Sequence, residues 1–235
     1  LYDLTTLQRE ANRQLGFTAE QTLSYTQSLY EKKLVTYPRT DSRYLTSDMS
    51  ANTPAVVKAA AGFFMPQNIE LSISLEQVTD NSKVSDHHAI IPTMNLQGCD
   101  IASLPFGERE VLQLIALRLV CAVGKSCRYG ETIVKANAGG AEFTAKGKTI
   151  LADGFRGIEK LYLTMKKEKP QEDKEKSLPK IDQGDSFTSK AAVKEGKTSP
   201  PKHFTDDTIL AAMENANTAL EDTDRKGIGT PATRA

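Results

Sequence analysis

Apolar residues recur at helical spacing near the start of the chain and predict its first helix. The apolar residues that share one face of this helix are Leu7, Ala11 and Leu15. Thr5 and Gln8 have the spacing of a capping box, so we expect the helix to begin there. Gly16 follows the last apolar position and predicts its end, because glycine readily adopts the left-handed conformation that terminates many helices.

The helical period continues to about residue 127. A second helix is expected from the capping box of Thr18 and Gln21 to Lys33. Residues 53–62 predict a third helix, with a proline in its first turn and a glycine at its end. The segment "EREVLQLIALRLVCAV", residues 108–123, is apolar nearly all round, which is typical of a buried helix.

The spacing of apolar residues along the chain changes after Cys127. Short alternating runs in residues 131–150 flank a Gly-Gly pair and predict a hairpin. Residues 186–195, "SFTSKAAVKE", have the pattern of another strand. The mixed charges of residues 166–177 indicate a solvated loop between these strands. This part of the chain is therefore predicted to be β-rich.

Helical spacing returns over residues 205–216, so the sequence predicts an α+β fold in three parts. We expect a helical domain over residues 1–127 and a partial β-rich domain over residues 128–203. A truncated helical segment is expected over residues 204–235.

Composition is that of a soluble globular protein of the cell interior. The 235 residues are 39% hydrophobic, enough to bury a core. No apolar run approaches the roughly 20 residues that span a bilayer, and no signal peptide precedes the first helix, so we expect a cytoplasmic protein without membrane contact. Formal net charge is zero, so an anionic partner must be met by local clusters of Lys and Arg. The three cysteines form no C-x-x-C pair and are expected to be reduced.

Both ends of the chain predict that it is a fragment of a longer protein. It opens on Leu1, not on a methionine, already close to a helix start. Thr230 and Pro231 have the cap and first-turn preferences of a helix that begins as the sequence stops. We therefore expect further segments outside this sequence.

The first motif that indicates chemistry is "TYPRTDSRY", residues 36–44. Pro38 disfavours the helical conformation for Tyr37. We therefore expect the chain at Tyr37 to exit the preceding helix in an extended conformation, with the tyrosine side chain accessible, as suits a nucleophile. A phenol with a pKa near ~10 needs a nearby cation or base to favour the phenolate. Arg39 can supply that cation and also clamp a phosphate oxygen.

The same motif offers further polar groups around a phosphate. Asp41 can orient Arg39, while Thr40 and Ser42 are short hydroxyl donors. The alternative interpretation is a buried tyrosine beside an Arg–Asp ion pair at a helix end, which is common in proteins that have no such function.

The second motif is "SDHHAIIPT", residues 85–93, with two of the three histidines of the chain. Either His87 or His88 can donate to a phosphate oxygen or move a proton. Adjacent histidines rarely bind one metal ion together and no cysteine lies close in sequence, so we predict no metal site there. A surface or capping pair is the alternative.

The third motif is "RKGIGTPATRA" at the end of the chain. A glycine-rich turn before a helix start exposes backbone amides that suit a phosphate, and the Thr233 hydroxyl can join them. An ordinary helix-start turn is the alternative, since the P-loop pattern is absent. Asp222 and Asp224 are interpreted as solvated turn acids and not as a magnesium site.

Together and in this order, the three motifs resemble those of type IA DNA topoisomerases, specifically the topoisomerase III branch. The residues that carry the resemblance are "TTLQREANRQLGFTAEQTLSYTQSLYEKKLVTYPRTDSRYL", "SDHHAIIPT", and "HFTDDTILAAMENA" with "GIGTPATRA". The resemblance covers most of the chain, and its first motif is highly specific. It implies a toroidal fold in which a helical domain with the tyrosine is carried on a β-rich arch.

The resemblance also implies a mechanism. Tyr37 would attack a phosphorus of single-stranded DNA, become joined to the 5′ phosphate and release a 3′ hydroxyl, without ATP. Arg39 matches the arginine that stabilises the phosphate, and His87 matches the histidine that contacts it. His88 departs from more distant members and is left unassigned.

Further positions match DNA contacts of the family. Thr233 matches a phosphate-contacting threonine, and the implied DNA contacts also include Thr40 and Ser42. Gln27 and Tyr30 lie on the helix that enters Tyr37, where the family touches the strand, and Tyr30 can stack on a base.

The resemblance implies Mg²⁺ as cofactor, bound by an amino-terminal domain that this sequence does not contain. We therefore expect the chain alone to be unable to relax DNA, although the longer protein should relax negative supercoils. The implied partner is single-stranded DNA, and a helicase is a further candidate partner in the cell. We expect the protein to be a monomer.

Two other functions use similar residues. A tyrosine recombinase also combines Tyr, Arg and His on a phosphate, but its tyrosine normally comes last in the chain and leaves a 3′ phosphotyrosine. A non-catalytic module for single strands would use three tyrosines as stacking platforms: Tyr30, Tyr37 and Tyr44. Changing Tyr37 to Phe separates stacking from covalent chemistry.

Overall fold

The structure is a computed structural model that describes residues 1–63, 71–167, 178–188, 190, 192–216 and 227–229. Its α-helices are α1 (Leu4–Leu15), α2 (Ala19–Glu31), α3 (Thr53–Ala61), α4 (Phe106–Val123), α5 (Phe155–Met165) and α6 (Asp206–Glu214). Its strands are β1 (Arg128–Ala138) and β2 (Ala141–Ala152). Short 3₁₀ helices lie at Ser47–Ala51, Asn81–Lys83, Met94–Gly98 and Ile101–Ser103. This mixture agrees with the predicted α+β class.

The first helix begins earlier than its sequence pattern predicted. Asp3 is the N-cap of α1, since its carboxylate accepts a hydrogen bond from the Thr6 amide at 2.6 Å. The prediction of a capping box at Thr5 and Gln8 was wrong, because both residues lie inside the helix and are fully buried. The predicted stop at Gly16 is confirmed, with a positive φ of 71°.

The next helices follow their sequence signals closely. The box of Thr18 and Gln21 caps α2 as predicted, and the helix ends at Glu31. The proline and glycine signals of residues 53–62 are likewise confirmed by α3. Predicted burial of residues 108–123 is confirmed by α4, which packs against α2, α3 and α5 at the centre of the core.

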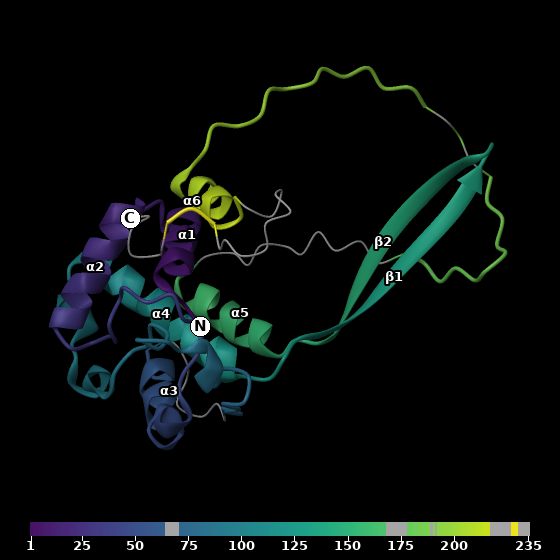
Figure 1. Ribbon diagram of the computed structural model, residues 1–235. Coiled ribbons are helices and arrows are strands. Elements are labelled where there is room, and N and C mark those ends of the chain that lie inside the picture. Colours follow the sequence, from purple (N-terminus) through teal and green to yellow (C-terminus); the bar gives the residue numbers. More distant parts are fainter. Residues whose placement is uncertain (64–70, 168–177, 189, 191, 217–226, 230–235) are drawn as a thin grey trace.

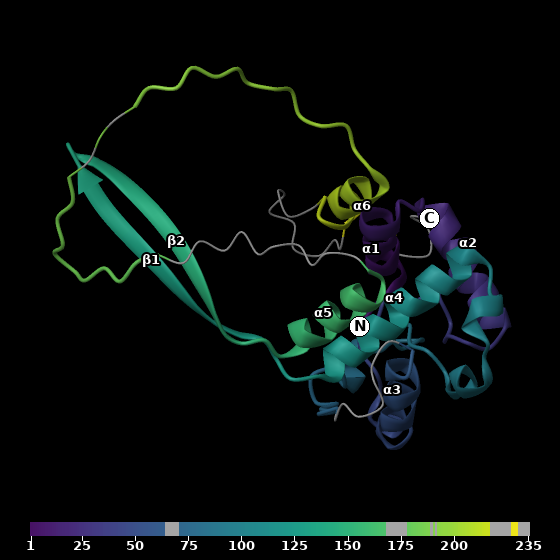
Figure 2. The ribbon, with the colours of Figure 1, turned by 180° about the vertical axis from the view of Figure 1, so that it is seen from behind.

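The hairpin of β1 and β2 is antiparallel and turns at Gly139 and Gly140, as predicted. Both glycines have positive φ, 60° and 86°, which favours glycine at the turn. The hairpin extends away from the helices (Figures 1 and 2), and most of its residues are exposed.

In the region after the hairpin one expected strand is absent from the described residues, and one helix was not expected. The described residues of 186–195 form no strand, because no described strand runs beside them to complete the backbone hydrogen bonds. Helix α5 was not predicted. It lies on α4, with Tyr162 buried and Ile158 packed against the core. The predicted domain boundaries stay a prediction.

The chain returns to the first helix at its end. Residues 192–204 form an extended arc that leads into α6 (Figure 1). The predicted helix over 205–216 is confirmed by α6, which is capped by Thr205 and packs on α1. Leu210 is buried there, and Asp206 accepts a hydrogen bond from the Ala19 amide at 2.7 Å. No described helix is long and apolar enough to cross a membrane.

Candidate active site around Tyr37

The segment that follows α2 is extended and pairs with the histidine segment. Lys33, two residues beyond the end of α2, has a positive φ of 60°. Val35 then forms a β-bridge with Pro92, and the Thr36 amide donates to the Ile91 carbonyl at 2.9 Å. Residues that are about 55 positions apart in the chain are thereby held side by side. The first and second motifs form one site.

Two buried hydroxyls fasten the loop after Tyr37 to the histidine segment. Thr40 is 3% exposed, and its Oγ1 donates to the His87 carbonyl at 2.9 Å while it accepts from the Ser42 amide at 3.1 Å. Ser42 is 4% exposed, and its Oγ donates to the Lys83 carbonyl at 2.8 Å. Each hydroxyl therefore has a structural partner, and its predicted contact with DNA stays a prediction.

Three aromatic rings from three segments meet at the surface. The ring centroids of Tyr37 and His87 are 4.4 Å apart, with an interplanar angle of 42°. Tyr30, on the last turn of α2, packs edge-on against Tyr37 with centroids 5.5 Å apart. Tyr37 is half-buried, whereas His87 and Tyr30 are exposed. A phenol oxygen, an imidazole and an exposed aromatic ring thus lie together.

The remaining predicted residues lie around these rings or outside the described part. Arg39 is exposed two residues beyond Tyr37. Gln27 lies one helical turn before Tyr30, and its Nε2 donates to the Glu31 carboxylate at 3.0 Å. Thr233 lies outside the described residues, as do Asp222, Asp224, Thr230 and Pro231. Of the third motif, the structure describes residues 227–229.

Lys83 is a further cation at this site that sequence reasoning missed. Its ammonium lies 4.4 Å from the centroid of the Tyr44 ring and donates to the Tyr44 hydroxyl at 3.3 Å. The hydrogen bonds that the ammonium donates to Asp80 and then to Tyr44 raise the pKa of Lys83, so it carries its charge. One face of Tyr44 is therefore occupied by a cation. No spacing in the sequence indicated that Lys83 returns to Tyr44.

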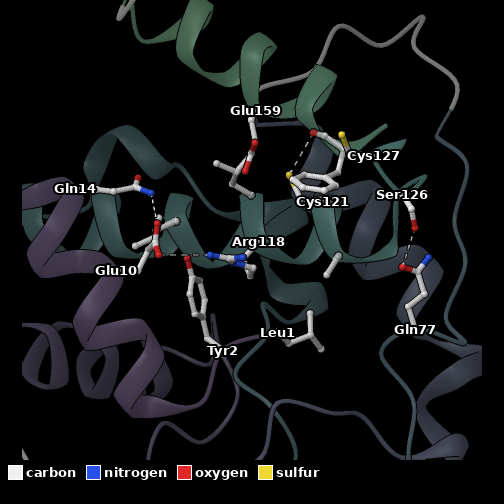
Figure 3. A pocket seen from close by; sticks show the side chains of 15 residues that line it. Leu1, Tyr2, Glu10, Gln14, Gln77, Arg118, Cys121, Ser126, Cys127 and Glu159 are labelled. Atoms are coloured by element: carbon white, nitrogen blue, oxygen red, sulfur yellow. Dashed lines mark hydrogen bonds and ion pairs between the residues drawn. The ribbon is translucent and has the colours of Figure 1, made fainter. Parts of the chain in front are cut away.

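A separate cavity of about 300 Å³ lies between α1, α4 and α5, and Tyr37 is not among its lining residues. Figure 3 shows Arg118 beside Tyr2 and Glu10 in this cavity. The Arg118 guanidinium lies 4.7 Å from the Tyr2 ring centroid and 3.5 Å from the Glu10 carboxylate. Burial raises the pKa of Tyr2, so its phenol stays protonated and is a poor nucleophile. Of these two tyrosines, Tyr37 has the accessibility that a nucleophile needs.

Cys121 in the same cavity gives a testable prediction. Burial raises the pKa of its thiol to about 12. At pH 8 the thiolate fraction would then be about 10⁻⁴, against about a quarter for an ordinary thiol. We expect iodoacetamide to alkylate Cys121 at least about a thousandfold more slowly in the folded chain than in urea, as read by peptide mass spectrometry. Equal rates in the two conditions would contradict the burial of this thiol.

The described residues offer no cluster suited to a divalent cation. Among residues 1–63, 71–167 and the shorter described stretches, no three His, Cys, Asp or Glu side chains converge as a metal site would require. The implied Mg²⁺ does not fit this part of the chain.

Comparison with known proteins identifies the family of the chain. A protein-family model described as DNA topoisomerase matches residues 1–235. The chain belongs to the DNA topoisomerase family. The resemblance to type IA enzymes of the topoisomerase III branch is thereby confirmed, since the relatives carry that name.

Three such relatives are proteins named DNA topoisomerase 3 from Bacillus species. The chain is 36% identical to that of Bacillus subtilis (strain 168), 37% to that of Bacillus licheniformis and 38% to that of Bacillus thuringiensis (strain Al Hakam). Each alignment covers all of this chain and 34% of the relative. The chain thus spans about a third of the length of these topoisomerases.

Proposed function

We propose that the protein containing this chain changes DNA topology by cutting and rejoining single-stranded DNA through Tyr37. The observation that supports this most directly is the packing of Tyr37 against His87, 4.4 Å between centroids, at the surface of a topoisomerase-family chain. The finer type IA mechanism is the one that fits these residues best. It relaxes negative supercoils in steps that need no ATP.

The covalent step exchanges one phosphodiester for another. The Tyr37 oxygen forms a bond to phosphorus and gives up its proton, while the bond from phosphorus to the 3′ oxygen breaks. That 3′ oxygen takes up a proton and leaves as a hydroxyl, and the 5′ phosphate stays on the tyrosine. Little bond energy is lost because the two esters are alike. Resealing is the reverse reaction.

The neighbours of Tyr37 have roles that follow from their chemistry. Arg39 would clamp the phosphate oxygens with its fork of donors, and His87 would donate to the phosphate or carry a proton. Tyr30 would stack on a base, and Gln27 would contact the strand. The buried threonine and serine hydroxyls of the loop would hold these groups in place, as their hydrogen bonds to carbonyls support.

The proposal also covers the chain in isolation. The longer topoisomerase would supply the Mg²⁺ that organises the cleaved ends, so we expect the 235-residue chain alone to leave supercoiled plasmid unchanged. We expect the full-length protein to be a monomer. A helicase is a further candidate partner in the cell.

A denaturant-quenched cleavage reaction tests the proposal. The full-length protein is incubated with Mg²⁺ and an oligonucleotide labelled at one end or the other, and the products are separated in denaturing gels. We expect the 3′-labelled fragment to stay on the protein and the 5′-labelled fragment to be released with a free 3′ hydroxyl. The opposite labelling would indicate the recombinase chemistry. Binding without any adduct would indicate a non-catalytic module.

A further inference from the structure

We propose that Arg43 is a positioning residue that couples the docking of α6 to the placement of the Tyr37 loop. The inference rests on the proposed function of Tyr37. Arg43 belongs to the first motif, but nothing in its position in the sequence assigned it a role. In the structure its side chain contacts both Asp3 at the start of α1 and Glu214 at the end of α6.

The Nε of Arg43 contacts the start of α1. Its Nε donates to the Asp3 Oδ2 at 2.7 Å, and the Asp3 side chain is 5% exposed. The other Asp3 oxygen caps the helix through the Thr6 amide. Just beside it, the Leu4 amide donates to the Thr40 carbonyl at 3.1 Å. The loop is therefore anchored to α1 at both Thr40 and Arg43.

The Nη2 of Arg43 contacts the end of α6. Its Nη2 lies 3.1 Å from the Glu214 Oε1, across 171 positions of sequence. The other Glu214 oxygen lies 3.5 Å from Arg9 on α1, and Arg9 also pairs with Asp207 at 2.8 Å. Glu214 thus takes part in docking α6 and in fixing the Tyr37 loop. An arginine suits this position because its Nε and Nη2 reach two separate carboxylates, whereas a lysine presents all its donors from one nitrogen.

The glycine segment of the third motif packs on the same end of α6. The Ile228 amide donates to the Met213 carbonyl at 2.8 Å. Gly227 has a φ of +72°, and a Cβ there would lie 2.4 Å from the Glu214 carbonyl oxygen. Glu214 is therefore where α6, the glycine segment and, through Arg43, the Tyr37 loop converge. If α6 undocked, Arg43 would lose its contact with Glu214, and the Tyr37 loop would be held less firmly.

The test compares adduct formation in the full-length protein and its variants. Arg43→Lys keeps a cation beside Asp3 but lacks the second nitrogen that reaches Glu214. Glu214→Ala removes the partner of Arg43 on α6 and leaves the pair of Arg43 with the buried Asp3 intact. We expect each to slow adduct formation about tenfold or more, since small misplacements of reacting groups are costly. The double variant should be no slower than the slower single one, because both remove one coupling. Glu142→Ala, on the exposed hairpin, should leave the rate unchanged.

Binding measurements separate positioning from direct contact with DNA. In a Tyr37→Phe background, we expect Arg43→Lys to leave the affinity for an oligonucleotide and its salt dependence unchanged. A loss of affinity in Arg43→Lys would show that the guanidinium contacts the DNA directly and would overturn the inference. Unchanged adduct rates in both single variants, or additive losses in the double, would also overturn it. No adduct from the unsubstituted protein would instead reject the proposed function, and this inference with it.

Discussion

Tyr37→Phe is expected to abolish the covalent adduct of the full-length protein with single-stranded DNA. The substitution removes the oxygen that would bond to phosphorus. The ring remains and keeps its contacts with His87 and Tyr30. Affinity for an oligonucleotide should therefore change less than about tenfold, the most that one hydrogen bond is ordinarily worth. A denaturing gel and a binding titration measure the two quantities on the same samples.

Tyr30→Phe is the matched control for this prediction. It removes the same hydroxyl from the neighbouring ring, which would stack on a base and take no part in bond formation. Adduct formation should continue in this variant. An adduct in Tyr37→Phe, or its loss in Tyr30→Phe alone, would show that a different residue is the nucleophile.

Thr40→Val is expected to destabilise the protein and to slow adduct formation. Valine has nearly the shape of threonine but leaves the His87 carbonyl and the Ser42 amide without the partners that Thr40 provides. Each buried polar group left unpaired costs about 1–3 kcal/mol, so we expect the free energy of unfolding to fall by about 2–4 kcal/mol. The adduct should form more slowly even well below the unfolding temperature, since the backbone that carries His87 loses an anchor.

Thr46→Val controls for the change of side chain. Thr46 precedes a 3₁₀ helix without making a side-chain cap, so its substitution should shift stability by less than about 0.5 kcal/mol. Denaturant titration of all three proteins gives the comparison. Equal stability of the Thr40 and Thr46 variants would contradict the anchoring role of Thr40.

Local signals predicted the helices well where the side chain that caps the backbone lies within three residues. Thr18 with Gln21 and the stop at Gly16 are such cases. At the first helix the sequence pattern predicted a cap at Thr5, but Asp3 is the cap, and its carboxylate also pairs with Arg43, 40 positions away. Helix α5 was missed because it follows β2 after a short turn, although Ile158 and Tyr162 have helical spacing.

The strand expected at 186–195 failed for a tertiary reason. Alternation predicts a strand only if another strand lies beside it, and the described sheet consists of β1 and β2. The hairpin was predictable because its two strands are each other's neighbours in sequence.

The candidate site was predictable in its members but not in its geometry. Resemblance to the family indicated Tyr37 and His87, and the structure places their rings in contact. The hydroxyl contacts of Thr40 and the bridge from Arg43 to Glu214 join residues 47 and 171 positions apart. No local pattern encodes such contacts, because they exist only once the helices have packed.

Peptide mapping of the covalent adduct is the most direct test of the central claim that Tyr37 is the nucleophile. The quenched complex of the full-length protein with DNA is digested with nuclease and protease, and the peptide that retains a nucleotide is sequenced by mass spectrometry. We predict a single phosphotyrosyl nucleotide, located on Tyr37. A nucleotide on Tyr30 or Tyr44, or on any residue other than a tyrosine, would contradict the account.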